Sequence, residues 1–382
     1  MTRSRLSALI CCLALLGACT TDLALDEGAP EPKPSATIEM IGGFQVRGDC
    51  DDLGGTRETQ LTFVVGNELL HAGRSVLNGK DGAALECSLK VRNPDGLEWG
   101  PVADRVLFGD LRRSDGEKTY KIDDEAESVS WSRPTGKSVV YISNGRLMKV
   151  DAFGEKPFDI SFLDEHDEVV YHPAGTHIAV TGTDKDGTYG VWLATNLGKE
   201  PQLLAIGEDA RRIFSLAFSH DGTTLYYAAE HDDHYDVHAL RLALSDDQGE
   251  IRDARLDTLD SSDGPMGDVV VWEFTFADEE AAGRVAYTTG TCEEGKTTHV
   301  WWAGKKTELG GTLAGYSTEP IGFLPDGRLV VIAREGCASK GTLFTWTKEE
   351  TKRIVGGATV AAVRTILPDP PGPPGSKQQV IA

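Results

Sequence analysis

FSHDGTTLYYAA, residues 218–229, is the stretch that decides the fold. It begins with an aromatic residue, Phe218, continues through the polar pair Asp221 and Gly222, and ends in an apolar run over residues 225–229. A glycine after an aspartate supplies the positive φ that a tight hairpin turn needs, and a Leu-Tyr-Tyr run favours a strand. The stretch therefore predicts two antiparallel strands joined by a tight turn, with the aromatic ring in the core.

The same pattern recurs along the chain, which is the mark of a repeat protein. Its aromatic residues, one in each copy, are Trp99, Trp131, Tyr171, Phe218, Phe276 and Phe323. Two further strands follow each copy, and four antiparallel strands in ~40 residues form one blade of a β-propeller. The sequence predicts an all-β protein, a six- or seven-bladed β-propeller of four-stranded antiparallel blades over residues 37–366, with the repeats clearest at 94–360.

Two blade counts stay open. Residues 60–92 contain short apolar runs and turn residues that could form a degenerate first blade, which would make seven. Otherwise six blades close with residues 36–46 added as an edge strand. A propeller must close its ring, so we expect strands from both ends of the folded region to share a blade.

Three copies carry a family resemblance. Residues 131–137 (WSRPTGK), 218–222 (FSHDG) and 323–328 (FLPDGR) resemble the WD-like W-S-P-D-G-K repeat of TolB-type propellers, which also occurs in the propeller domain of prolyl oligopeptidases. The catalytic G-x-S-x-G elbow of those peptidases is absent from this sequence. The resemblance implies a propeller that binds protein partners in the bacterial cell envelope.

The first residues of the sequence predict export and attachment to a membrane. Arg3 and Arg5 precede an uncharged apolar run over residues 6–16, which is too short to span a bilayer but fits a signal peptide. The run ends in Leu-Gly-Ala-Cys at residues 16–19, which resembles the lipobox of bacterial lipoproteins. This implies that the signal peptide 1–18 is removed and that Cys19 carries the lipid, with the outer membrane as the site of anchoring in a cell with two membranes.

Two segments flank the predicted propeller. Residues 19–36 and 367–382 are rich in proline and poor in large apolar groups, so we expect a disordered tether and a disordered tail. The net charge of −22 repels phosphate backbones. The composition therefore argues against nucleic acid as a partner.

Four cysteines lie within the predicted propeller: Cys50, Cys87, Cys292 and Cys337. An even number in an exported chain suggests disulfides. Cys292 and Cys337 each follow the second strand of neighbouring repeats, so a bond between them is expected, which leaves Cys50 to pair with Cys87. The alternative is four free thiols.

The densest group of metal-ligand side chains is HDDHYDVH, residues 231–238, with His231, His234, Asp236 and His238 as weak candidates. It falls between the second and third strands of one repeat. We expect a solvated loop, with no metal and no cofactor bound, in which His234 and His238 do not share a face. Residues 184–187 (DKDG) faintly resemble a calcium loop but are equally a common turn.

No catalytic motif is recognisable in the sequence. The leading hypothesis is therefore that the chain is a monomeric, non-catalytic scaffold. It would be held in the bacterial cell envelope by the lipid on Cys19 and would bind envelope proteins. One alternative is an enzyme, a glycan hydrolase or lyase with paired carboxylates at the mouth of the propeller channel. Another is a sensor that binds a small ligand or a metal through residues 231–238.

Overall fold

The computed structural model describes residues 39–41, 44–46, 59–80, 85, 88–90, 97–99, 106–108, 112–114, 119–121, 123, 125–133, 135–151, 156–207, 209–219, 221–244, 251–263, 266–272, 284–302 and 305–364. The chain divides into two compact units, 1–37 and 38–382, and every described residue belongs to the second. The signal peptide, the tether, the tail, Cys19, Cys50, Cys87 and Phe276 all lie outside the described residues. No helix in the described ranges is long and apolar enough to cross a membrane.

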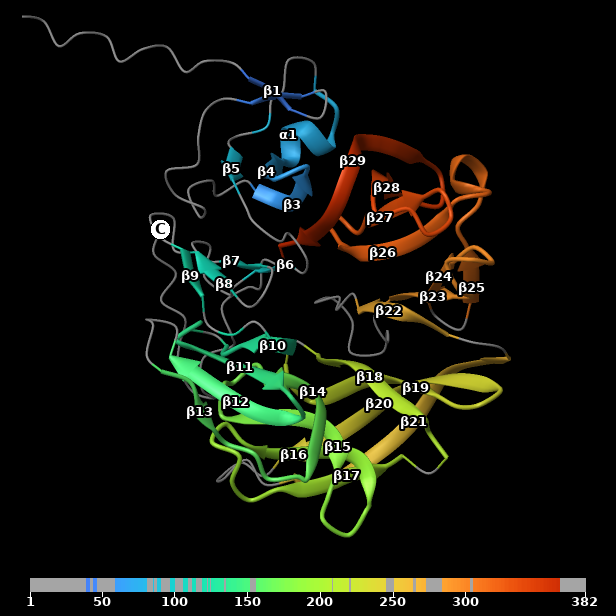
Figure 1. Cartoon of the computed structure of the whole chain (residues 1–382). Coiled ribbons are helices and arrows are strands. Elements are labelled where there is room, and N and C mark those ends of the chain that lie inside the picture. The colour runs from blue at the N-terminus through green and yellow to red at the C-terminus, as the bar shows by residue number, and fades with distance from the viewer. Residues whose placement is uncertain are drawn as a thin grey trace, which may run out of the picture. The chain divides into compact units, whose positions relative to one another are not determined.

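Antiparallel strands make up most of the described residues (Figure 1). Five sheets contain four strands each, and within each sheet every strand pairs with the next one along the chain. The sheets are β6 (Leu97–Trp99), β7 (Val106–Phe108), β8 (Arg112–Ser114) and β9 (Thr119–Lys121); β10 (Ala126–Trp131), β11 (Ser138–Ser143), β12 (Arg146–Asp151) and β13 (Phe158–Asp159); β14 (Glu165–Tyr171), β15 (His177–Thr183), β16 (Tyr189–Thr195) and β17 (Gln202–Ile206); β18 (Arg212–Phe218), β19 (Thr224–Glu230), β20 (His234–Leu244) and β21 (Ile251–Asp263); and β22 (Met266–Trp272), β23 (Val285–Thr289), β24 (Thr297–Trp302) and β25 (Lys305–Glu308).

The remaining blade strands form one sheet of seven, in the order β26 (Ser317–Phe323), β27 (Leu329–Arg334), β28 (Gly341–Trp346), β29 (Thr351–Val363), β3 (Thr59–Val65), β4 (Glu68–Gly73) and β5 (Ser88–Lys90). Strand β29 is long enough to pair with β28 up to Ala358 and with β3 from Ala358 to Val363. Strands from both ends of the folded region therefore share a sheet.

The predicted count of six or seven four-stranded blades is wrong for the described residues, which contain five. The predicted count fails because of β29. Its 13 residues pair first with β28 and then with β3, and so join two groups of strands that the repeat pattern separates.

The segment predicted as an edge strand of the propeller, residues 36–46, behaves differently. Its described part forms β1 (Glu39–Ile41) and β2 (Phe44–Val46), which pair with each other in a separate two-stranded sheet. The prediction of an added edge strand is therefore wrong. Short helices in the described ranges are α1 (Arg74–Leu77) and a 3₁₀ turn at Gly311–Leu313.

Neighbouring blades pack through their first strands and through shared apolar layers. β10 contacts β14, β14 contacts β18, β18 contacts β22, and β22 contacts β26. One buried layer joins Val140 and Ile142 of β11 to Val169 of β14 and Ile178 of β15. Successive four-stranded antiparallel sheets stacked in this way make an all-β propeller, as the sequence predicts.

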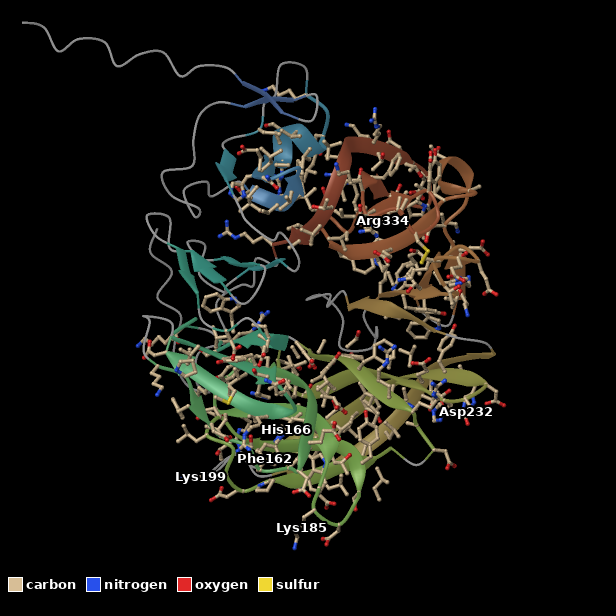
Figure 2. The ribbon with its side chains drawn as sticks, viewed as in Figure 1. Phe162, His166, Lys185, Lys199, Asp232 and Arg334 are labelled. Carbon is tan, nitrogen blue, oxygen red and sulfur yellow. A yellow bond between two sulfur atoms is a disulfide. The ribbon has the colours of Figure 1, made fainter. Side chains whose placement is uncertain are left out.

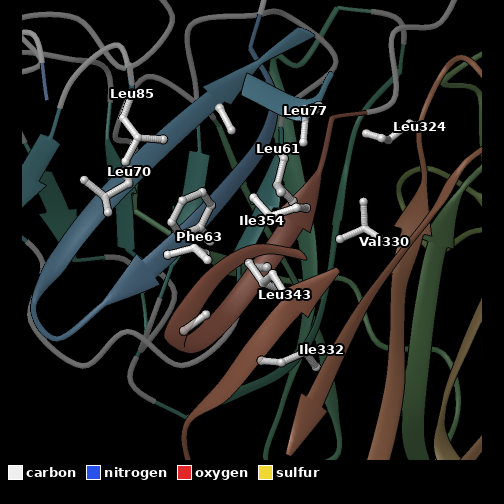
Figure 3. Close-up of a cluster of buried hydrophobic side chains, with 14 residues drawn as sticks. Leu61, Phe63, Leu70, Leu77, Leu85, Leu324, Val330, Ile332, Leu343 and Ile354 are labelled. Carbon is white, nitrogen blue, oxygen red and sulfur yellow. The ribbon is translucent and has the colours of Figure 1, made fainter. Parts of the chain in front are cut away.

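The seven-stranded sheet has its own core (Figure 3). Leu61 and Phe63 from β3 pack with Ile332 from β27 and Leu343 from β28, and Leu77 of α1 lies against the same cluster. These side chains are between 0 and 1% exposed. Since burying each large apolar side chain contributes ~1.5–3 kcal/mol, this layer fastens the N-terminal strands to the C-terminal ones.

The turn between the first and second strands of a blade touches the blade before it. Gly222 has φ +76°, and a Cβ atom there would collide with the ring of His172 in the preceding blade. The His172 Nε2 donates to the Gly222 carbonyl at 3.2 Å, and its ring packs edge-on against Phe218 with centroids 4.9 Å apart. Gly175, with φ +72°, lies in the same way against the Arg133 carbonyl. The repeat glycine therefore serves both the turn and the contact between blades.

We predict that Gly222→Ala lowers the free energy of unfolding by about 3 kcal/mol, because the alanine is strained at positive φ and also displaces the His172 ring. Gly187→Ala is the matched control, since Gly187 has φ +82° but nothing within 4 Å of the added methyl group. It should cost only about 1 kcal/mol. Urea unfolding of the two variants measures the difference, and equal losses would contradict the inter-blade role.

Candidate functional site

The end of β20 holds three of the candidate metal ligands. β20 begins at His234, and it pairs with β19 as Glu230↔Tyr235 and with β21 as His234↔Asp263. Since alternate residues of a strand point to one face, His234, Asp236 and His238 share a face. The expectation that His234 and His238 lie on different faces is wrong, because the strand begins three residues before the apolar Val237 that marked it in the sequence.

The fourth candidate comes from the β19–β20 turn, where Asp232 is labelled in Figure 2. The His231 backbone N–H donates to the His234 carbonyl at 2.9 Å, which closes the turn. The His231 and His234 rings are stacked, with centroids 4.2 Å apart and planes 1° from parallel. The turn thus places His231 beside the face that carries the other three residues.

The three histidine side chains converge on one oxygen of the Asp236 carboxylate. Asp236 Oδ2 lies 3.7 Å from Nε2 of His231, 3.9 Å from Nε2 of His234 and 3.9 Å from Nε2 of His238. One ligand atom each from His231, His234 and Asp236 lie within 4.8 Å of one another. The side chains of His231, Asp236 and His238 are 14%, 20% and 10% exposed and that of His234 is 39% exposed, so the cluster opens to solvent on the His234 side.

The other nitrogen of each imidazole has its own partner. His231 Nδ1 donates to the Asp209 carbonyl at 3.2 Å, and His234 Nδ1 donates to the Asp233 carboxylate at 2.7 Å. His238 Nδ1 is 3.2 Å from the Thr258 hydroxyl on β21. Carbonyl and carboxylate oxygens only accept, so in a neutral ring the proton of His231 and of His234 sits on Nδ1 and the lone pair sits on Nε2.

Burial and charge also shape the cluster. Burial lowers the pKa of His238 and outweighs the nearby charge of Asp236, which acts to raise it. Burial therefore favours the neutral form of His238. The hydrogen bond from His234 lowers the pKa of Asp233. Two nearby carboxylates are paired with arginines, since Glu230 lies 3.1 Å from Arg212 and Asp232 lies 3.6 Å from Arg211.

The loop at residues 184–187 is a turn that uses its own aspartate. Asp184 Oδ1 accepts from the backbone N–H groups of Asp186 and Thr188 at 2.9 and 2.8 Å. The loop borders an open cavity of about 490 Å³ that is also lined by Asn144, Asp164 and Glu165. The Asp184 carboxylate therefore stabilises the backbone of the turn, which is the alternative to a calcium loop.

Four of the repeat aromatics are buried or partly buried. Trp131, Tyr171 and Phe218 are 2%, 1% and 6% exposed, and Phe323 is partly buried. The Tyr171 hydroxyl lies 3.0 Å from the Ser138 hydroxyl of the preceding blade. Trp99 lies in β6, of which only the backbone is described.

A group of carboxylates on the first strands of the blades has no recognisable signal in the sequence. β10 and β14 each carry a bulge, at Glu127 and at Asp167 respectively. Partial desolvation, then the charge of Glu165, then that of Glu127, raise the pKa of Asp167. A bulge adds one extra residue to a strand and so shifts the alternation of its side chains between the two faces. No simple spacing in the sequence predicts where a bulge occurs.

Other carboxylates of the first strands hold the blades together. Glu168 of β14 accepts from the Leu216 backbone N–H of β18 at 3.1 Å, and burial raises its pKa. Glu319 of β26 is paired with Lys296 at 2.9 Å and with Arg334, which together lower its pKa against the effect of burial. These two groups are therefore committed to structural contacts.

The structure joins Cys292 to Cys337 in a disulfide, with Cα atoms 4.9 Å apart and a sequence separation of 45. Cys292 lies in the β23–β24 turn and Cys337 in the β27–β28 turn. These turns are equivalent to the β19–β20 turn that carries His231. The bond ties two neighbouring sheets together at that end of their strands.

Comparison with known proteins places the chain among β-propellers. No family model matches it, and no curated protein matches it. Among solved structures it is similar to the tricorn protease, with 15% identity, a TM-score of 0.51, and 89% of this chain but 37% of that one covered. It is also similar to an oligogalacturonate lyase in complex with manganese, with 13% identity, a TM-score of 0.50, and 76% and 91% covered.

A putative TolB from Agrobacterium tumefaciens is a further similar structure. It has 14% identity and a TM-score of 0.41, with 63% of this chain and 87% of that one covered. At these identities the comparisons show the propeller fold alone. The chain spans little more than a third of the tricorn protease that it matches.

We predict that Cys292→Ser/Cys337→Ser lowers the free energy of unfolding by about 4 kcal/mol, the chain-entropy value for a loop of 45 residues. Each single substitution should lower it by a similar amount, since either one breaks the bond. Urea unfolding of the three variants makes the comparison. Additive losses from the two single variants, or a midpoint unchanged in the double variant, would show that the bond does not restrain the unfolded chain.

Proposed function

We propose that this chain is a lipid-anchored, non-catalytic β-propeller that binds protein partners in the bacterial cell envelope. The observation that carries the proposal lies on the fourth strands of three successive blades. Phe158 of β13, Ile206 of β17 and Leu256 of β21 are 47%, 57% and 47% exposed. Each strand is the edge of its sheet, and an edge that presents both unpaired backbone groups and large apolar side chains is a surface for another protein.

Two further observations support the proposed location in the cell envelope. Residues 16–19 resemble a lipobox, which supports lipidation of Cys19. The disulfide between Cys292 and Cys337 fits an oxidising compartment, since such bonds are rare in the cytosol. The acidic composition favours protein over nucleic acid as the partner.

A second candidate is an enzyme that cleaves glycans by hydrolysis or elimination. Glu127 and Asp167 stand at bulges of adjacent first strands, and burial and the charges of Glu165 and Glu127 raise the pKa of Asp167. Glycosidases divide the work of base and acid between two carboxyl groups that flank the scissile bond. Glu127 would be the base and Asp167 the acid.

We predict that a photo-crosslinking amino acid at Ile206 captures a defined envelope protein in cells that produce the lipidated chain, because this exposed edge position meets the partner. Lys185 is the matched control, since its side chain is 82% exposed but lies in the β15–β16 turn. Mass spectrometry of the adducts identifies the partner. Equal labelling at both positions, or no saturable adduct at Ile206, would count against partner binding.

The anchor is tested in the same strain with Cys19→Ser, which should move the chain from the membrane to the soluble exported fraction and reduce the adduct. Cys11→Ser, within the predicted signal peptide, should leave both unchanged. A Cys19→Ser chain that stays on the membrane would overturn the lipid anchor but not the edge-strand surface.

We predict for the enzymatic candidate that Asp167→Asn abolishes release of reducing ends or unsaturated ends from envelope polysaccharides and polyuronates, because the amide cannot donate a proton as the acid does. Asp186→Asn, a change in an exposed turn, should retain full release. A native chain that releases neither product from any of these glycans would remove this candidate.

A further inference from the structure

We propose that His231, His234 and Asp236, with His238 as the fourth ligand, bind one divalent transition-metal ion at the end of the β18–β21 blade. The inference goes beyond the proposed scaffold and does not depend on it. It rests on the distances around Asp236 Oδ2 and on the hydrogen bonds that orient the three rings.

Hydrogen-bond acceptors face one another across the cluster. Since the proton of His231 and of His234 is held on Nδ1 in the neutral ring, each Nε2 presents a lone pair toward the Asp236 carboxylate. The Nε2 of His231 is buried and makes no hydrogen bond. A buried lone pair directed at a carboxylate is costly unless a cation lies between them.

The distances suit a shared ion rather than direct hydrogen bonds. The separations of 3.7–3.9 Å exceed hydrogen-bond length. Two ligand atoms bound to one tetrahedral zinc at 2.0–2.1 Å lie about 3.4 Å apart. A contraction of a few tenths of an ångström would bring the Asp236 oxygen to that spacing from each nitrogen, and one ligand atom each from His231, His234 and Asp236 already lie within 4.8 Å of one another.

The outer contacts are those that metal-bound imidazoles use. A ligating histidine usually gives its other N–H to a carbonyl, a carboxylate or another oxygen, which fixes the ring and raises its basicity. The Asp209 carbonyl, the Asp233 carboxylate and the Thr258 hydroxyl occupy these three positions. Such support on three rings at once distinguishes the cluster from a chance gathering of polar side chains.

The donor set defines the class of ion. Imidazole nitrogen with one carboxylate suits Zn²⁺, Cu²⁺, Ni²⁺ and iron, whereas Mg²⁺ and Ca²⁺ prefer oxygen alone. The ion would tie the β17–β18 connection, through Asp209 and His231, to the beginning of β20. Exposure of His234 leaves an approach from solvent through which the ion could enter.

The experiment uses the folded full chain, freed of metal by a chelator and titrated with Co²⁺ and with Zn²⁺. We expect one equivalent to bind, a visible absorption band of tetrahedral Co²⁺, and a higher melting temperature with Zn²⁺. Asp236→Asn and His234→Ala should weaken binding more than 10-fold, and Thr258→Val should weaken it by ~10-fold through the lost outer contact. His177→Ala, a histidine paired with Thr176 on another blade, is the control and should bind as the native chain does.

Three results would overturn the proposal. Asp236→Asn could bind as tightly as the native chain, or His177→Ala could lose as much affinity as His234→Ala. The native chain could also bind neither ion while Asp236→Asn changes only the pH dependence of the melting temperature. In that case protons rather than a metal would bridge the histidines to Asp236. Folding of each variant is checked by its circular dichroism before titration, and the conservative Thr258→Val preserves the shape of the side chain if the others fail to fold.

Discussion

The contact between each repeat turn and the blade before it is the constraint on which the remaining structure depends. A four-stranded blade cannot bury both of its faces, so it is stable only against a neighbour. Gly222 meets the His172 ring and Gly175 meets the Arg133 carbonyl, at positions where a side chain would not fit. The same glycines hold the positive φ of the turn. One residue thus fixes both the hairpin and the spacing of the blades.

This constraint restricts the sequence at one end of each blade more than at the other end. The turn between first and second strands is committed to the neighbouring blade, whereas the turn between second and third strands lies at the other end of the second strand. That second turn carries the variable chemistry. It holds Asp184 in one blade, His231 in the next and the bonded cysteines 292 and 337 in two others. Substitution there leaves the glycine contact at the other end of the blade untouched.

The repeat made the fold predictable, but its limits explain what was missed. Aromatic residues, turn glycines and β-branched runs are local signals, so the four-stranded antiparallel blades follow from them. The length of β29 has no local signal in the sequence, because its second half is defined by pairing with β3 at the other end of the folded region. The predicted number of blades is wrong for this reason.

The residues of the His-Asp cluster are recognisable in the sequence as a dense group of histidines and aspartates. Their shared face was missed because a polar strand beginning at His234 looks like a loop until its pairing with β19 is seen. Glu127 and Asp167 each stand at a β-bulge, and the hydrophobic periodicity of the sequence does not predict bulges.

The His-Asp cluster is not a requirement of the blade itself. Asp236 pairs with Ala229, and the equivalent pair in the preceding blade is Gly190 with Gly182. His238 pairs with Tyr227, and its equivalent is Trp192, opposite Val180. The same strand position thus holds a glycine or a tryptophan where only packing is needed. A partly buried carboxylate facing three imidazoles is costly in such a place. Among the described residues such a group occurs in the β18–β21 blade, which argues for a role in binding rather than in the fold.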